Sequence, residues 1–145
     1  METLRRNFPT SVRAVSGQDF TAEFIITSSA VDSYGEIVIP SGVDFAQFMR
    51  NPVVPDSHDY SSVGNQIGTA TKIFLQGGKL VALIRFAADV EGNDLAKLAW
   101  NMVQAGHLRA CSIGFMPVAT LRQAASRALA LPGSQRRGSA PPGGI

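Results

Sequence analysis

The sequence predicts an α+β domain with a mostly antiparallel, barrel-like β-sheet, one principal helix and one short helix. Three observations support this fold class. Residues 19–32 alternate between apolar and polar side chains, which is typical of a strand with one buried face. Residues 65–90 contain two strand-like runs joined by Gly77-Gly78, the pattern of a β-hairpin. Residues 91–107 instead place apolar side chains at helical spacing.

The N-terminal half supplies the strands and the short helix. The core face of the first strand is expected to comprise Phe20, Ala22, Phe24 and Ile26. Ile37 to Ile39 form a short apolar run between turn residues, which predicts a second strand. Residues 44–51 predict a short helix that is capped by Asp44 and ends before Pro52. Its apolar residues follow the i, i+3, i+4 pattern: Phe45, Phe48 and Met49.

The second half supplies the hairpin, the principal helix and a last strand. Residues 52–64 predict a loop or short strand that carries His58. The first hairpin strand is expected to alternate through Ile67, Thr69, Thr71 and Ile73. The principal helix is expected from Asn93, as its cap, to Ala105, with Gly106 as a left-handed stop. Its expected buried face is Leu95, Leu98, Ala99, Met102 and Val103. Residues 108–117 predict the last strand.

The composition is that of an ordinary globular protein. The chain has 145 residues, 45% of them hydrophobic and 17% charged, which suits one domain with one core. No apolar run approaches the roughly 20 residues of a membrane helix, and the N-terminus lacks the apolar stretch of a secretory signal. One cysteine and two histidines predict neither a disulfide nor a zinc cluster. We therefore expect a cytoplasmic protein without cofactor or metal.

The charge is unevenly distributed along the chain. Residues 1–116 carry a net charge of −2, and residues 117–145 carry +4 with no acidic residue. The predicted domain therefore spans residues 19–117, between an N-terminal arm at 1–18 and a basic, disordered tail at 118–145. Four scattered arginines without lysine or aromatic residues favour a solvated tail over a nucleic-acid-binding one.

Two residues are candidates for covalent chemistry. His58 lies in a loop between Asp56 and Asp59, where nothing local explains an imidazole, although a loop histidine is often only a surface residue. Ser112 lies between small residues on one face of the last predicted strand. It is either an accessible nucleophile or a small residue that lets another element pack closely. Serine needs a base such as histidine, and His58 could meet Ser112 if their strands joined one sheet.

The other two reactive side chains have structural interpretations. Cys111 points to the opposite, apolar face of the same strand, so we expect a buried cysteine rather than a thiolate nucleophile. His107 lies at the C-terminal end of the principal helix, where a cation interacts favourably with the helix dipole.

Four runs follow one another within residues 20–117: "AVDSYGEIVIPSG", "NPVVPDSHDYSSVGNQIGTATKI", "GGKLVALIRFA" and "LAWNMVQAGHLRACSIGFMP". In this order they resemble the prohead proteases of tailed bacteriophages, which are capsid maturation serine proteases similar in fold to herpesvirus assemblins. The most specific features of the resemblance are a histidine followed by an Ile-Gly pair, here His58 and Ile67-Gly68, and the Ser-Ile-Gly-Phe run that begins at Ser112.

The resemblance implies a role for each candidate residue. His58 matches the general base and Ser112 matches the nucleophile of a serine endopeptidase. The implied substrates are the scaffold and the major capsid protein, cleaved within the assembling prohead in the bacterial cytoplasm. A homodimer is compatible with the resemblance because relatives of this fold often pair.

The tail departs from the family pattern. Similar proteases continue beyond the serine strand into further elements, where an acidic partner for the histidine is expected, whereas the residues after Pro117 contain no acid. Asp59 is not expected to replace it, because neighbouring side chains of an extended segment point in opposite directions. The alternative expectation is therefore a truncated, catalytically inactive prophage remnant or a capsid-assembly binding partner.

Overall fold

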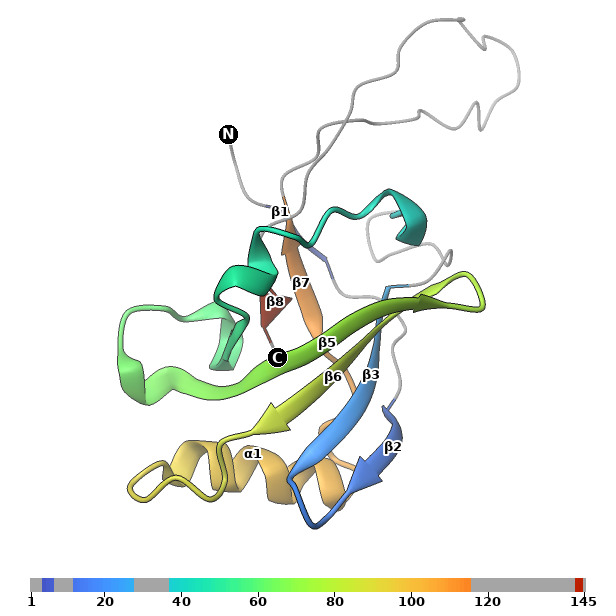
Figure 1. Ribbon diagram of the computed structural model, residues 1–145. Coiled ribbons are helices and arrows are strands. Elements are labelled where there is room, and N and C mark those ends of the chain that lie inside the picture. The colour runs from blue at the N-terminus through green and yellow to red at the C-terminus, as the bar shows by residue number, and fades with distance from the viewer. Residues whose placement is uncertain (1–3, 7–11, 28–36, 116–142, 145) are drawn as a thin grey trace, which may run out of the picture.

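The computed structural model describes residues 4–6, 12–27, 37–115 and 143–144, which form two antiparallel sheets and one α-helix (Figure 1). The strands are β1 (Leu4–Arg6), β2 (Val12–Ser16), β3 (Thr21–Thr27), β4 (Val53–Pro55), β5 (Gln66–Gln76), β6 (Lys79–Phe86), β7 (Ser112–Phe115) and β8 (Gly143–Gly144). The helices are α1 (Asp94–Gln104) and four 3₁₀ turns: η1 (Pro40–Gly42), η2 (Phe48–Arg50), η3 (Asp56–His58) and η4 (Val63–Asn65).

The larger sheet has five strands in the order β2-β3-β6-β5-β4, and the smaller has three in the order β1-β7-β8. The α+β class and the antiparallel sheet with one principal helix are therefore confirmed. Within the described residues the larger sheet is open, with β2 and β4 at its edges. The strands β1 and β2 lie within residues 1–18, for which the sequence predicted only an N-terminal arm.

The β5–β6 hairpin forms as predicted around Gly77 and Gly78. Both glycines have positive φ angles, 57° and 72°, as a two-residue turn between twisted strands requires. The expected alternation along β5 is wrong in its middle, where Ala70 is buried and Thr69 and Thr71 are exposed. The pairing with β6 then shifts by one residue between Ala70 and Lys72. Such a β-bulge changes which of the later side chains face the core.

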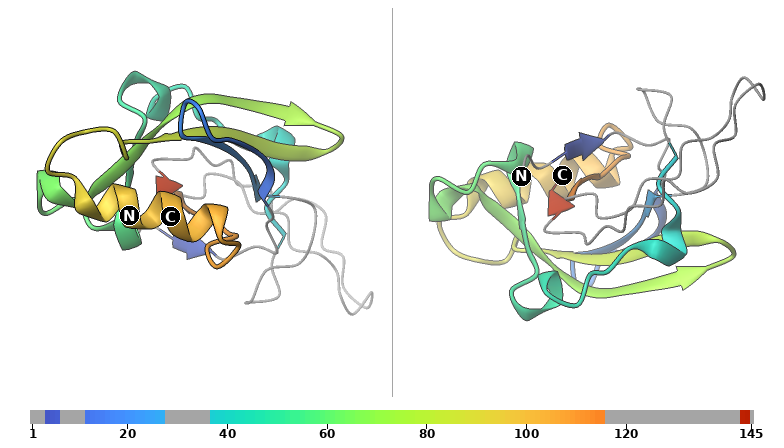
Figure 2. Two further views of the ribbon diagram at one scale, coloured as in Figure 1. Left: turned by 90° about the horizontal axis from the view of Figure 1, so that it is seen from below. Right: turned by 90° about the horizontal axis from the view of Figure 1, so that it is seen from above.

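The core lies between the five-stranded sheet and α1 (Figure 2). The predicted face of β3 is confirmed, since Ala22, Phe24 and Ile26 are all buried. Trp100 of α1 contacts the ring of Phe20 edge-on, with a centroid separation of 5.8 Å, and the ring of Phe86 at 5.5 Å. These aromatic contacts fix the helix on the sheet.

The predicted buried face of the helix is partly wrong. The buried residues are Ala96, Trp100 and Val103, while Leu98 and Met102 are 58% and 40% exposed. The i, i+4, i+7 spacing places the single tryptophan at the centre of the buried stripe, and its bulk turns Leu98 outward.

The predicted helix boundaries are confirmed. The Asn93 side chain accepts a hydrogen bond from the Ala96 amide at 3.1 Å, which caps the first turn. Its amide group also donates to the carbonyl oxygen of Gln66 at 2.8 Å and so joins the helix to the start of β5. Gly106 has a φ of 79°, the left-handed geometry that ends a helix.

Three other predicted elements differ. Ile37 to Ile39 form no strand and lead into η1, because Pro40 lacks the amide that a continuing ladder needs. The short helix of residues 44–51 is reduced to η2, although the Asp44 carboxylate accepts from the Ala46 amide as expected of a cap. The last strand begins at Ser112 rather than at residue 108.

Two residues of the predicted tail belong to the described part of the chain. Gly143 and Gly144 form β8, which pairs with β7. The rest of the predicted tail, and the end of the strand predicted over residues 19–32, lie outside the described residues.

Candidate active site

Ser112 is the first residue of β7, the central strand of the smaller sheet. On one side β7 pairs with β1, and on the other it pairs with β8, where Ser112 lies opposite Gly144. The pairing with β1 covers Ile113 to Phe115, so β8 is the strand that lies opposite Ser112. The sheet gives the segment that carries Ser112 the rigid support that a nucleophile requires.

Cys111, directly before Ser112, is buried, as predicted. Burial raises the pKa of its thiol to about 12, because the charged thiolate is poorly solvated in an apolar environment. At neutral pH the group is therefore a protonated thiol and not a nucleophile. This leaves Ser112 as the candidate nucleophile of the segment.

His58 ends η3, directly after the edge strand β4. Its side chain is 8% exposed, so it is not the solvated surface histidine that was the alternative interpretation. The backbone is left-handed at both Ser57 and His58, with φ angles of 50° and 57°. Two consecutive non-glycine residues in this region cost about 1–2 kcal/mol each. Such strain persists where surrounding structure enforces it, and it is concentrated at functional sites.

The acids beside His58 have their own partners. The Asp56 carboxylate accepts a hydrogen bond from the Ser57 hydroxyl at 3.3 Å. The Asp59 carboxylate accepts from the Ser61 amide at 2.9 Å, and its pKa is lowered by hydrogen bonds from Ser61. Asp59 is thus engaged by the following turn, in keeping with the expectation that it does not orient His58.

The structure places the two candidate residues in different sheets. Ser112 belongs to the smaller sheet, whereas His58 follows β4 at the edge of the larger one, so the idea that they lie on strands of one sheet is wrong. What connects them is β8, which lies beside β7 in Figure 1 and also contacts both β4 and η3. The segments that carry Ser112 and His58 therefore border the same two-residue strand.

Gly68 explains the Ile-Gly pair of the sequence. Gly68 lies opposite Phe86 in β6 and opposite Val54 in β4. A Cβ atom added at Gly68 would lie 2.6 Å from the carbonyl oxygen of Arg85, so only glycine allows this close approach of strands. On its other side Gly68 pairs with β4, which leads directly into η3 and His58.

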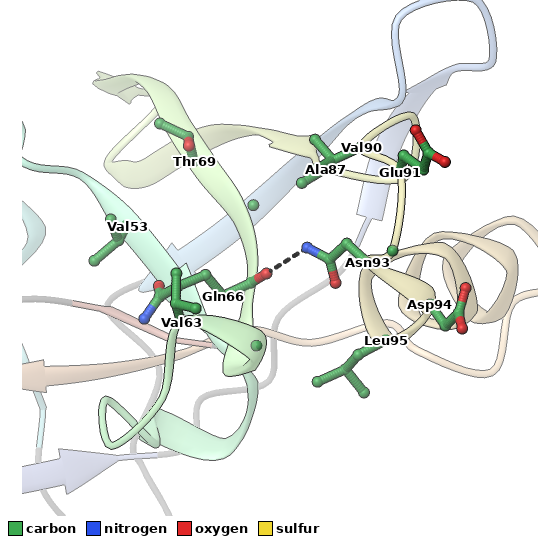
Figure 3. Close-up of a pocket in the computed structure, with 13 residues that line it drawn as sticks. Val53, Val63, Gln66, Thr69, Ala87, Val90, Glu91, Asn93, Asp94 and Leu95 are labelled. Carbon is green, nitrogen blue, oxygen red and sulfur yellow. Dashed lines mark hydrogen bonds between the residues drawn. The ribbon is translucent and has the colours of Figure 1, made fainter.

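A surface groove of about 550 Å³, which the sequence did not predict, lies beside the start of α1 (Figure 3). Val63 and Val90, two of its lining residues, are 88% and 54% exposed. Glu91 and Asp94 also line the groove, and the side-chain oxygen of Gln66 is buried without a hydrogen-bond partner in the described part of the chain. The isolated valines in otherwise polar loops were the signal in the sequence.

Other kinds of site find no support among the described residues. No group of three or more histidine, cysteine, aspartate or glutamate side chains within them is placed to hold a metal ion. No helix in these segments is both long and apolar enough to cross a membrane. His107 is exposed and lies just beyond the end of α1.

Comparison of the chain with protein-family models, with curated proteins and with solved structures finds no match.

Proposed function

We propose that the chain is a serine endopeptidase of phage prohead maturation, with Ser112 as nucleophile and His58 as general base in an assemblin-like, barrel-like arrangement. Its proposed substrates are the scaffold and the major capsid protein. The observation that carries the proposal is the position of β8, which pairs with the Ser112 strand and contacts the η3 turn that ends at His58. Both candidate residues thus belong to segments that border one narrow region.

The environment of His58 supports a role as base. A side chain that is 8% exposed samples fewer orientations than a surface imidazole, which favours a fixed proton acceptor. Ser57 and His58 also have a strained, left-handed backbone that the surrounding fold must maintain. Backbone strain of this kind is often found at catalytic residues.

The proposed reaction follows the general course of serine proteolysis. The Ser112 hydroxyl attacks the scissile carbonyl carbon while His58 accepts the hydroxyl proton. His58 then gives this proton to the departing amine, which leaves an acyl group on Ser112. Water, deprotonated by His58, attacks the acyl carbonyl and releases the carboxylic acid with Ser112 regenerated. The buried, protonated thiol of Cys111 takes no part.

Co-expression with a tailed-phage major capsid protein that retains its scaffold-like arm tests the proposal. Cleavage of the arm is expected with the native chain and is expected to be lost with Ser112→Ala and with His58→Ala. The matched controls are Ser16→Ala and His107→Ala, which change an exposed serine and an exposed histidine. Undiminished cleavage by either active-site variant would refute the assignment.

The second candidate is a catalytically silent capsid-assembly partner. The groove beside α1, with its exposed Val63 and Val90, favours this alternative because exposed apolar surface commonly marks a binding site. Capsid protein that co-purifies with the chain, combined with no labelling of Ser112 by a fluorophosphonate, would select it. Loss of co-purification in a Val63→Asp variant would locate the contact.

A further inference from the structure

The strand β8 occupies a position that an extended peptide could take. Gly144 lies opposite Ser112 and Gly143 opposite Ile113, in antiparallel register. The other edge of β7 is already paired with β1, so β8 fills the edge that faces β4 and η3. A peptide added at this edge would run along Ser112 while bordering the turn that carries His58.

The two glycines of β8 indicate which kind of peptide could replace this strand beside β7. Both residues of β8 are glycine, so only backbone lies between β7 on one side and β4 with η3 on the other. Peptides that add to a sheet edge gain affinity through main-chain hydrogen bonds and specificity through their side chains. A position filled by two glycines therefore suits an extended segment with very small side chains.

From this placement we infer that the β8 position is the substrate-peptide site, and that Gly143-Gly144 occupies it as an internal pseudosubstrate. The ligand class is an extended peptide with glycine or comparably small residues opposite Ser112 and Ile113. The inference rests on the proposed protease function for its catalytic consequence, but peptide binding at β7 is a property of its own. Displacement of β8 is the event that opens the site.

The pairing of β8 with β7 is weak enough for a competing peptide to replace β8. Two residues supply few ladder hydrogen bonds, and glycine loses more backbone entropy on ordering than any other residue. A tethered segment of this kind has an effective concentration of about 1 mM, so one that binds with a Kd of about 0.1 mM would weaken a competing peptide about tenfold. The presence of β8 would therefore weaken the binding of a substrate peptide without preventing it.

A binding measurement tests the site without requiring catalysis. The probe is a fluorescein-labelled peptide, Ala-Pro-Pro-Gly-Gly-Ile, which copies residues 140–145. The full chain carries Ser112→Ala, which prevents turnover, together with Gly143→Pro and Gly144→Pro, which remove the β8 amide donors. The matched control carries Gly138→Pro instead, outside β8. We expect the peptide to bind the β8 variant about tenfold more tightly than the control.

A second peptide tests the preference for small residues. The same probe with valine in place of both glycines is expected to bind at least about tenfold more weakly, since it must fit side chains where the chain has none. If the proline variant does not fold, as judged by its Trp100 fluorescence, Gly143→Val with Gly144→Val takes its place. Equal binding to the β8 variant and the control, or no binding to either, overturns the inference.

Labelling by a fluorophosphonate separates this inference from the proposed function. With Ser112 restored, the β8 variant is expected to be labelled about tenfold faster than the Gly138→Pro control. Peptide binding without any labelling of Ser112 would retain the peptide site and reject the protease. Equal labelling of both chains, without peptide binding, would retain the protease and reject the pseudosubstrate.

Discussion

Replacing Gly68 with alanine tests whether the close approach of β5 and β6 fixes this part of the fold. The added methyl carbon would lie 2.6 Å from the Arg85 carbonyl oxygen and 3.3 Å from the Arg85 carbonyl carbon and the Phe86 Cα. Ordinary contact begins at 3.4 Å, so the strands would have to separate by about 0.8 Å at this point. All three obstructing atoms are backbone, which cannot move aside as a side chain could.

The expected loss of stability follows from this overlap. Extra methyl groups forced into packed structure typically cost about 1–3 kcal/mol. The lower entropy of an unfolded chain with alanine offsets about 0.4–1 kcal/mol. We therefore expect the free energy of unfolding to fall by about 1–2 kcal/mol. With a urea m-value of about 1–3 kcal/mol per molar, the urea concentration at the midpoint of unfolding would fall by about 1 M.

Urea titration followed by tryptophan fluorescence measures this change directly, because Trp100 is the single tryptophan and is 3% exposed. Gly42→Ala is the matched control, since a Cβ atom at Gly42 would meet nothing within 4 Å. A Gly68→Ala midpoint equal to that of Gly42→Ala would refute the close-packing argument.

Three further perturbations have defined outcomes. Asn93→Ala removes a cap and the bond to Gln66, and by urea titration should cost about 1–2 kcal/mol, whereas exposed Asn101→Ala should not destabilise. Phe86→Ala should cost about 3–5 kcal/mol in the same assay, because its ring is fully buried; a cost below about 1 kcal/mol would contradict the described core. The pKa of the Cys111 thiol is about 12 in the folded chain, compared with an ordinary value of 9.0, so above pH 9 the unfolded chain binds fewer protons than the folded chain. Its unfolding free energy should then fall by up to about 1.4 kcal/mol per pH unit toward pH 12, and a Cys111→Ala chain with the same slope would disprove this.

The local elements were the predictable part of the fold. The alternation in β3, the Gly77-Gly78 turn, the Asn93 cap and the Gly106 stop depend on interactions between residues close in sequence. The buried face of α1 was not predictable in the same way. The predicted face included Leu98 and left out Trp100, whereas the contacts of Trp100 with Phe20 and Phe86 decide which side is buried.

The candidate site was predictable as residues but not as an arrangement. The sequence singled out His58 and Ser112, and it assigned Cys111 to the core. It did not indicate that β4 and β7 belong to different sheets, because strand order depends on contacts between distant segments. Nor did it indicate that Gly143-Gly144 lies at the edge of β7, since a glycine- and proline-rich composition predicts disorder.

The most direct test of the central claim is fluorophosphonate labelling of the full chain, with the modified residue located by mass spectrometry. The native chain and the Gly143→Pro, Gly144→Pro variant are each compared with the same chain carrying His58→Ala. We predict labelling at Ser112 in both parent chains, and its loss by a factor of about 10³ or more when the base is removed. Labelling at Ser112 that is unchanged by His58→Ala, or no labelling in either parent chain, would contradict the assignment of these two residues as a catalytic pair.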